Sequence, residues 1–242
     1  MRGLAVGEVH VWCAAPGELE RDGLVGSAQT LLAEDEIKRL GRFRFARHRL
    51  MFLATRALVR QVLSRYAPVA PEEWTFVTTS HGRPEIARPR SPLRFNLSNT
   101  DGLVVCAVTH GLDVGVDVES LARPAPIEMA DRFFAPAESR ALHSLPVSER
   151  ARRFFDYWTL KEAYLKARGF GLNLPLDAFA MLVSREAIEI SFTPDIADDP
   201  EGWRFSLCSP SPSHRLAIAD GSRATGGLPI TRNAWPLQEA AE

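Results

Sequence analysis

Apolar side chains recur at three- and four-residue intervals in two long stretches, and this spacing predicts two amphipathic helices. In residues 45–66 the apolar stripe consists of Leu50, Leu53, Ala54, Ala57, Leu58 and Val62. In the second stretch, Tyr157, Leu160, Ala163, Tyr164 and Ala167 can cover a core. Ser148 is a suitable cap for the second helix, and Gly169 is a suitable end.

Alternating or continuous apolar runs predict strands between and around these helices. They cover residues 6–12, 74–79, 94–97, 103–109, 113–119, 182–192, 203–208 and 215–219, and shorter helices are predicted at 27–40, 127–134 and 136–145. The nearly all-apolar run 103–109 is expected to be buried on both faces. His110 and Gly111 are expected to turn it into a hairpin with 113–119.

The order strand, helices, strands occurs twice, which predicts an α+β fold of two units of similar size, joined near residues 110–113. We expect one half at residues 1–111 and the other at 112–222. The remaining residues, 223–242, contain many Gly, Ala and Pro residues and are expected to form a flexible tail.

Composition narrows the class of protein. The 242 residues are 45% hydrophobic and carry a net charge of −1, so no global field attracts the chain to nucleic acid or to a membrane surface. The three widely spaced cysteines, Cys13, Cys106 and Cys208, are expected to be unpaired thiols in a reducing compartment. With neither an 18-residue apolar run nor a secretory signal, a cytoplasmic location is expected. The chain is also expected to be a monomer.

Two carboxylates share one face of the strand predicted at 113–119. The two-residue period directs Val114, Val116 and Val118 to one face and Gly115, Asp117 and Glu119 to the other. Neighbouring carboxylates repel each other and need compensation. The face is either a solvated edge or a site for Mg²⁺, with Gly115 leaving room for a ligand.

The helix at 154–168 carries a polar stripe, because Trp158, Glu162 and Lys166 recur every four residues. In one interpretation Glu162 and Lys166 form an ordinary ion pair and Trp158 belongs to the core. In the other, Glu162 is a third metal ligand and Lys166 binds phosphate, so that the stripe completes a site for Mg²⁺ and a pyrophosphate group.

These segments match two family motifs in order. Residues 115–119 read GVDVE, a GxDxE motif, and residues 158–166 read WTLKEAYLK, a WxxKEAxxK motif. The pair resembles the surfactin-synthetase type of 4′-phosphopantetheinyl transferase. Further matches are the sequences HGRP at 81–84, FNLS at 95–98, RFF at 132–134 followed by Glu138, and GFGL at 169–172.

The resemblance implies a pseudo-dimer of two similar α+β halves with the active site between them. It also implies a Mg²⁺-dependent transfer of phosphopantetheine from coenzyme A to a serine of an acyl, peptidyl or aryl carrier protein, which releases 3′,5′-ADP. Asp117, Glu119 and Glu162 would hold the metal, and Asp117, Glu162 and Lys166 would be catalytic. The implied coenzyme A contacts are Gly82, Arg83, Pro84, Ser98, Asn99, Thr100, Lys161, Lys166, Arg47 and Arg49.

Two segments depart from the family pattern. Asn99 stands where the family usually has a histidine that helps to bind a coenzyme A phosphate, and an asparagine cannot carry its positive charge. Weaker binding or compensation by arginines is therefore expected. The basic run 42–49 does not align cleanly with the family, so Arg47 and Arg49 either bind phosphate or belong to a solvated basic face.

The sequence allows alternatives to transferase activity. A non-catalytic protein of this fold could bind coenzyme A or a carrier protein, and Asn99 favours that alternative, whereas the intact acidic residues and Lys166 oppose it. A Mg²⁺-dependent phosphohydrolase is disfavoured by the GRP and FN-x-S segments. The absence of GxSxG and of GxxxxGK[ST] argues against acyl-hydrolase and P-loop chemistry. Residues 118–134 are expected to receive the carrier protein.

Overall fold

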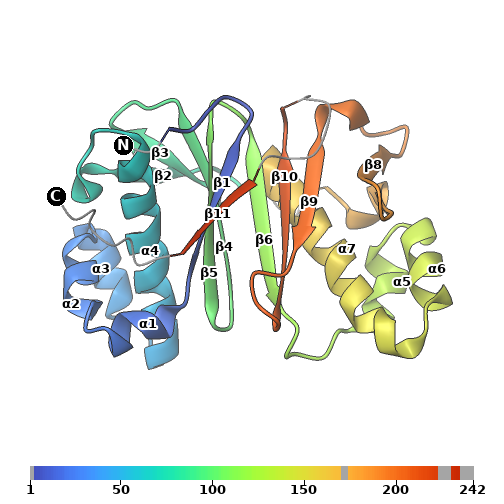
Figure 1. Ribbon diagram of the computed structural model, residues 1–242, viewed down its shortest axis with the longest axis horizontal. Helices are drawn as coiled ribbons and strands as arrows, with labels where there is room; N and C mark the ends of the chain where they lie inside the picture. The colour runs from blue at the N-terminus through green and yellow to red at the C-terminus, as the bar shows by residue number, and fades with distance from the viewer. Residues whose placement is uncertain (1–2, 170–173, 223–229, 235–242) are drawn as a thin grey trace. The chain divides into compact units, whose positions relative to one another are not determined.

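The computed structural model describes residues 3–169, 174–222 and 230–234 (Figure 1). Its internal contacts divide the chain into two units. Unit 1 comprises Met1–Gly111 and Pro229–Glu242, and unit 2 comprises Leu112–Leu228. Within the described ranges, no helix is both long enough and apolar enough to cross a membrane.

In unit 1, one long helix packs against a mixed sheet and against three short helices. The helices are α1 (Pro16–Arg21), α2 (Val25–Thr30), α3 (Glu34–Leu40) and α4 (Ala46–Tyr66), and a 3₁₀ turn spans Pro71–Glu73. The strands are β1 (Val9–Ala14), β2 (Thr75–Thr78), β3 (Pro84–Arg88), β4 (Leu93–Thr100), β5 (Leu103–His110) and β11 (Ile230–Ala234). The main sheet has the order β11-β1-β5-β4, and β2 and β3 form a separate hairpin. Figure 1 shows α2 and α3 on the side of α4 that faces away from this sheet.

The apolar stripe of α4 forms the centre of the core of unit 1. Leu53, Ala54, Ala57, Leu58 and Val62 are all at most 2% exposed, and they pack in one cluster with apolar residues of β4 and β5. Strand β5 is buried on both faces from Leu103 to Thr109, which confirms the expectation drawn from its continuous apolar run.

The expected C-terminal tail is wrong for five residues. Strand β11 runs parallel to β1, with Val9 opposite Ile230 and Cys13 opposite Ala234. The opposite edge of β1 pairs with β5, so β11 supplies backbone partners to an edge that would otherwise be open. Residues 223–229 and 235–242 lie outside the described residues.

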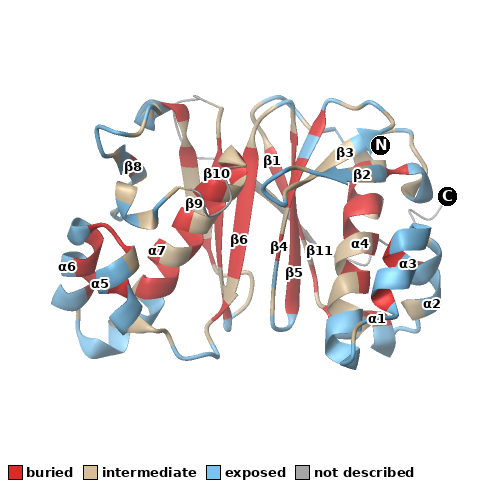
Figure 2. Ribbon diagram, turned by 180° about the vertical axis from the view of Figure 1, so that it is seen from behind, coloured by how far each residue is buried: buried red, intermediate tan, exposed pale blue. Residues whose placement is uncertain are grey.

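Unit 2 has the same general plan. The helices are α5 (Ala130–Phe133), α6 (Pro136–Ser144) and α7 (Val147–Arg168), with 3₁₀ turns at Ile127–Met129, Leu176–Ala178 and Pro200–Gly202. The strands are β6 (Val114–Ser120), β7 (Phe179–Val183), β8 (Ile188–Phe192), β9 (Arg204–Cys208) and β10 (His214–Asp220). The sheet order is β6-β10-β9, and β7 and β8 form a hairpin. Helix α7 covers the sheet and is buried along much of its length (Figure 2).

Three predicted connections differ in the structure. Strand β6 pairs with β10 and not with β5, so the predicted hairpin across Gly111 is wrong. The predicted strand 182–192 is interrupted because the Ser184 hydroxyl accepts the amides of Glu186 and Ala187 and forms the β7–β8 turn. Helix α7 begins at Val147, so Ser148 lies in its first turn rather than at its cap.

Two further elements were misjudged from the sequence. The predicted helix 27–40 is divided into α2 and α3, because the Glu36 carboxylate accepts the amide of Ala33 and starts a new helix there. Strand β3 was not predicted, since its proline-flanked sequence indicates a loop. It is held in place by pairing with β2.

Candidate active site

Strand β6 presents its two carboxylates to helix α7. Val114, Val116 and Val118 are at most 1% exposed and occupy one face, as the alternation predicts. On the other face, Asp117 is 6% exposed and Glu119 is half-buried. The solvated-edge interpretation is therefore wrong for Asp117, because the helix covers this face.

Gly115 allows the helix to cross the strand at close range. A Cβ atom at this position would overlap the carbonyl oxygen of Ala163 and would lie 2.5 Å from the amide nitrogen of Ala167. Both of those atoms belong to the helix backbone, which cannot move aside as a flexible side chain could. The expectation that Gly115 leaves room for a ligand is therefore wrong, because α7 fills the space beside it.

The close approach brings Lys166 to Asp117. The Lys166 ammonium lies 2.6 Å from Asp117 Oδ1 and donates to the Val116 carbonyl oxygen at 3.2 Å. Lys166 of the predicted polar stripe therefore faces the carboxylate strand, whereas Trp158 packs against the core of unit 2, as the first interpretation expected. The Lys166 side chain keeps 29% of its surface exposed, so the ammonium also borders solvent.

Glu119 has a cationic neighbour that the sequence analysis did not identify. Arg123 lies 2.8 Å from Glu119 Oε1, and its guanidinium stacks over the Phe155 ring at 5.1 Å. Burial, followed by the charge of Asp117, raises the pKa of Glu119, while Arg123 acts in the opposite direction. The four-residue separation between Glu119 and Arg123 was the available signal, but it follows the end of a strand, where helical spacing rules do not apply.

Glu162 is electrostatically coupled to the same carboxylates. Burial is the main cause that raises its pKa, and the charges of Asp117 and Glu119 add to the effect, whereas Lys166 opposes it. The three acids thus repel one another, with Lys166 and Arg123 as cationic neighbours. An added cation would relieve this repulsion.

The donor chemistry of these residues fits Mg²⁺, which prefers carboxylate oxygens. In the described part of the chain, however, no three His, Cys, Asp or Glu side chains lie close enough together to hold one metal ion as they stand. Asp117 instead directs one oxygen to Lys166. The trio supplies suitable ligands, and metal binding by Asp117, Glu119 and Glu162 stays a prediction.

Lys161 does not contact this surface, although it precedes Glu162. Its side chain is fully buried, and its ammonium lies 2.8 Å from Glu138 Oε2 and donates to the carbonyl oxygens of Leu176 and Phe179. The pKa of Lys161 is lowered by burial, and the charge of Glu138 opposes that effect. The expected phosphate contact is therefore wrong, since all three ammonium hydrogens have acceptors inside unit 2.

In unit 1, the HGRP segment forms a tight turn into β3. Gly82 has φ +84°, a left-handed conformation that favours glycine, and its amide donates to the Thr79 carbonyl oxygen. Arg83 follows at the turn, and Pro84 begins the strand. The segment lines a cavity of about 360 Å³ that is bordered by Arg83, Pro84, Glu85, Ile86, Ser91, Pro92, Leu93, Arg94, Phe95 and Gly111.

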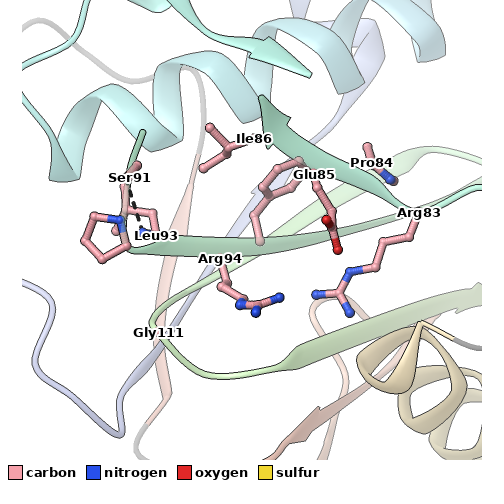
Figure 3. Close-up of a pocket in the computed structure, with 10 residues that line it drawn as sticks. Arg83, Pro84, Glu85, Ile86, Ser91, Leu93, Arg94 and Gly111 are labelled. Carbon is pink, nitrogen blue, oxygen red and sulfur yellow. Dashed lines mark hydrogen bonds between the residues drawn. The ribbon is translucent and has the colours of Figure 1, made fainter. Parts of the chain in front are cut away.

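Figure 3 shows the side chains of Arg83, Glu85 and Arg94 in this cavity, with the two guanidinium groups directed toward one another. Arg94 was not among the predicted site residues. Its position immediately before the FN-x-S segment was the only signal in the sequence, and the resemblance assigns no role to it.

Residues 98–100, with the sequence SNT, direct their side chains alternately to the two faces of β4. Ser98 is buried and lies on the same face as Arg94 and Asn96, whereas Asn99 is exposed and lies on the face of Phe95 and Leu97. The strand predicted at 94–97 is too short, because β4 continues to Thr100. Ser98 and Thr100 therefore share one face of the strand, and Asn99 lies on the other.

Arg47 and Arg49 lie at the exposed start of α4. Arg47 contacts the His48 ring nitrogen and the face of Phe45, and Arg49 donates to the Phe43 carbonyl oxygen. Both side chains border solvent. The geometry is compatible with either interpretation from the sequence, so phosphate binding by these residues stays a prediction.

Comparison with known proteins places this arrangement in a family. The profile of the 4′-phosphopantetheinyl transferase superfamily matches residues 113–219, and that of the N-terminal domain of 4′-phosphopantetheinyl transferase matches residues 23–111. The chain belongs to the 4′-phosphopantetheinyl transferase family, in its two-domain Sfp type. It is an enzyme of that class, as the sequence motifs predicted.

Three relatives illustrate the similarity. The 4′-phosphopantetheinyl transferase HetI of Nostoc sp. is 39% identical over 77% of this chain and 75% of its own length. A phosphopantetheinyl transferase of Thraustochytrium sp. is 30% identical over 94% of this chain and 83% of its own length. The 4′-phosphopantetheinyl transferase Sfp of Bacillus subtilis is 31% identical over 64% of this chain and 71% of its own length.

Proposed function

We propose that this transferase moves the 4′-phosphopantetheine group from coenzyme A to a serine of an apo carrier protein and that unit 2 carries the chemistry. The observation that supports this assignment is the Lys166–Asp117 contact of 2.6 Å. It places a cation for the pyrophosphate beside a carboxylate for a metal ion. Two further carboxylates, Glu119 and Glu162, are coupled to Asp117 by charge.

The roles follow from the needs of phosphoryl transfer, in which positioning and charge neutralisation dominate. Asp117, Glu119 and Glu162 would hold Mg²⁺, which when bound supplies Lewis-acid stabilisation of the pyrophosphate oxygens. Lys166 binds the pyrophosphate and neutralises the charge that develops on the leaving 3′,5′-ADP. Either Glu162 or a water molecule accepts the proton of the carrier serine.

The residues of unit 1 would bind the nucleotide end of coenzyme A. Arg83, which the structure places in a cavity beside the Gly82 turn, is the principal cation for this role. Ser98 lies on one face of β4 and adds a neutral hydrogen-bonding group. This assignment separates the two functions: unit 1 recognises the nucleotide, and unit 2 stabilises the reaction.

The test is the intact mass of a purified apo carrier protein after incubation with this protein, coenzyme A and Mg²⁺. We expect a gain of one phosphopantetheine group that is lost with EDTA and reduced at least ~100-fold in rate by Asp117→Asn. Glu186→Gln is the matched control, because Glu186 is exposed in the β7–β8 turn and should leave the rate unchanged.

The second candidate function is binding without transfer, which the neutral Asn99 favours. In that case the carrier mass stays constant while coenzyme A still binds measurably. Carriers from fatty-acid, polyketide, nonribosomal-peptide and lysine pathways should be tested in parallel. A lack of mass gain on all of them, despite measurable binding of coenzyme A, would replace the transferase assignment by the binding one.

A further inference from the structure

One carboxylate oxygen contacts three side chains near the end of helix α7. Asp198 lies in the segment between β8 and the 3₁₀ turn at Pro200–Gly202, and its side chain is 13% exposed. Its Oδ2 atom accepts the Tyr164 hydroxyl at 2.6 Å and the Trp203 indole N–H at 3.2 Å. Arg168 Nε lies 3.2 Å from the same oxygen. Asp198 has no part in the chemistry assigned to unit 2, so its contacts call for a separate explanation.

The position of this carboxylate is unfavourable unless the carboxylate is paired. It lies beside the last turn of α7, which ends at Arg168, and the negative end of a helix dipole is located at that terminus. The three side chains offset the repulsion, and Asp198 Oδ1 accepts the Asp199 amide at 2.8 Å, so both oxygens have partners. The Arg168 guanidinium also lies over the Trp203 ring at 5.8 Å. Asp198 therefore forms a specific contact between the helix and the segment after β8, and not a general end cap.

The turn that Asp198 contacts carries Lys166. The last four carbonyl groups of a helix have no partners within the helix, so other contacts determine how firmly that turn is held. Tyr164 and Arg168 lie two residues before and after Lys166, which places them about 200° from it around the helix. Lys166 contacts Asp117 on the side of β6. The last turn of α7 is thus held on two opposite sides, by strand β6 and by Asp198.

We propose that Asp198 is a positioning residue, which holds the last turn of α7 so that the Lys166 ammonium stays beside Asp117. This inference rests on the proposed role of Lys166 in the transfer. Without the carboxylate, the buried Tyr164 hydroxyl loses its acceptor, and the turn can shift away from β6. A shift of the ammonium weakens its contact with the charge that develops in the transition state, so kcat should fall more than KM rises.

The decisive experiment is a double-mutant cycle between Asp198→Ala and Lys166→Ala, with kcat measured from the mass gain of an apo carrier protein. We expect Asp198→Ala to lower kcat about tenfold in the wild type, and by less than about twofold in the Lys166→Ala background. Equal losses in both backgrounds would overturn the proposal, because Asp198 would then act without Lys166.

Further variants separate positioning from a general loss of stability. Asp198→Asn keeps an oxygen that can accept the Tyr164 hydroxyl, so it should retain more of kcat than Asp198→Ala does. Asp195→Ala is the matched control, because Asp195 is exposed in the same segment and should leave kcat unchanged. If Asp198→Ala does not fold, Tyr164→Phe takes its place in the cycle, because it removes one donor and keeps the ring.

Hydrogen exchange of the α7 amides gives a readout that does not depend on transfer. Asp198→Ala should accelerate exchange about tenfold or more over residues 164–168 and leave residues 154–160 unchanged. Unchanged exchange over 164–168 would overturn the proposal. If exchange there accelerates but Lys166→Ala retains full transfer activity, Asp198 still holds the end of the helix, and the proposed role of Lys166 fails.

Discussion

In both units a buried ion pair joins the long helix to the start of a shorter helix. The two long helices differ in the side chains that they direct to the strand beneath them. In unit 1, Arg60 of α4 is 2% exposed and lies 2.7 Å from Glu36 at the start of α3. In unit 2, Lys161 of α7 is fully buried and lies 2.8 Å from Glu138 at the start of α6. Each glutamate also accepts the amide of the alanine three residues before it.

The difference lies in the strand beneath each helix. Helix α4 packs on β5, whose Val104, Cys106 and Val108 side chains belong to the core cluster. Helix α7 crosses β6 at Gly115, where no side chain separates the two backbones. The same arrangement of helix and sheet can therefore serve a core or a polar site. A glycine in the strand decides which, because it lets polar groups of the helix and the strand come into contact.

Removal of the buried cations should produce the largest effect on stability. We expect Lys161→Met to lower the free energy of unfolding by about 3–5 kcal/mol, because the buried Glu138 carboxylate loses its cation. Arg60→Met should lower it less, because Arg56 still lies 3.3 Å from Glu36. Urea denaturation measures the change. Lys166→Met should lower transferase activity while changing the stability far less, because Lys166 is partly exposed.

If Lys161→Met instead leaves the unfolding midpoint unchanged and abolishes binding of coenzyme A, Lys161 acts in ligand binding. The ion pair between Lys161 and Glu138 would then not stabilise unit 2 as the ion pair between Arg60 and Glu36 stabilises unit 1.

Substitution of Gly115, which lies beneath α7, should lower the stability nearly as much. Gly115→Ala places a methyl group against helix backbone, so we expect a loss of about 2–3 kcal/mol and reduced activity from a displaced Lys166. Gly41→Ala is the control, since its nearest neighbours lie 3.7 Å away and its backbone is right-handed helical. Equal stability of the two variants would show that the close crossing is not required.

Neutralising Glu162 should raise the stability of the protein, by a smaller amount than the preceding substitutions lower it. Its pKa in the folded protein is raised above the usual 4.5, so its ionised form opposes folding. This penalty is absent below the unfolded pKa and grows as pH rises through the folded value. At neutral pH, Glu162→Gln should therefore raise Tm by about 2–4 °C, the shift that 1 kcal/mol produces in a protein of this size.

Thermal scans at several pH values check this expectation, because the gain should disappear below about pH 4, where Glu162 is protonated in both states. Mg²⁺ should raise the Tm of the wild type more than that of Glu162→Gln. A gain of the same size at every pH would mean that packing, and not charge, is responsible.

The smallest effect is expected at Asn99. Because Asn99 lies on the face of β4 opposite Arg94, Asn99→His should change KM for coenzyme A by less than about threefold and the stability by less than about 0.5 kcal/mol. Steady-state kinetics across pH 5–8 would detect an added imidazolium. A tenfold fall in KM at low pH would show that a cation at this strand end contacts a coenzyme A phosphate.

Local patterns in the sequence predicted the elements that depend on local physics. The 3.6-residue stripe of α4, the two-sided burial of β5 and the alternation of Asp117 against Val116 follow from neighbours in the chain. The family motifs then identified the class of enzyme, because the two short segments occur in the right order.

The remaining features depend on residues that are distant in sequence. The partner of β6, the burial of Lys161 against Glu138 and the contact between Gly115 and α7 are set by tertiary packing. Periodicity placed Lys161 about 100° from Glu162 on the helix, but it could not show what covers that side. Arg94 was missed because a single arginine before a strand carries no pattern of its own.

The pairing of β11 with β1 has a consequence for the order in which the protein is made. The sheet of unit 1 contains a strand that leaves the ribosome only after all the described residues of unit 2. Until then, one edge of β1 offers open backbone groups that can pair with another chain. The nascent protein therefore completes its first unit last, and protection of that edge during synthesis depends on residues 230–234.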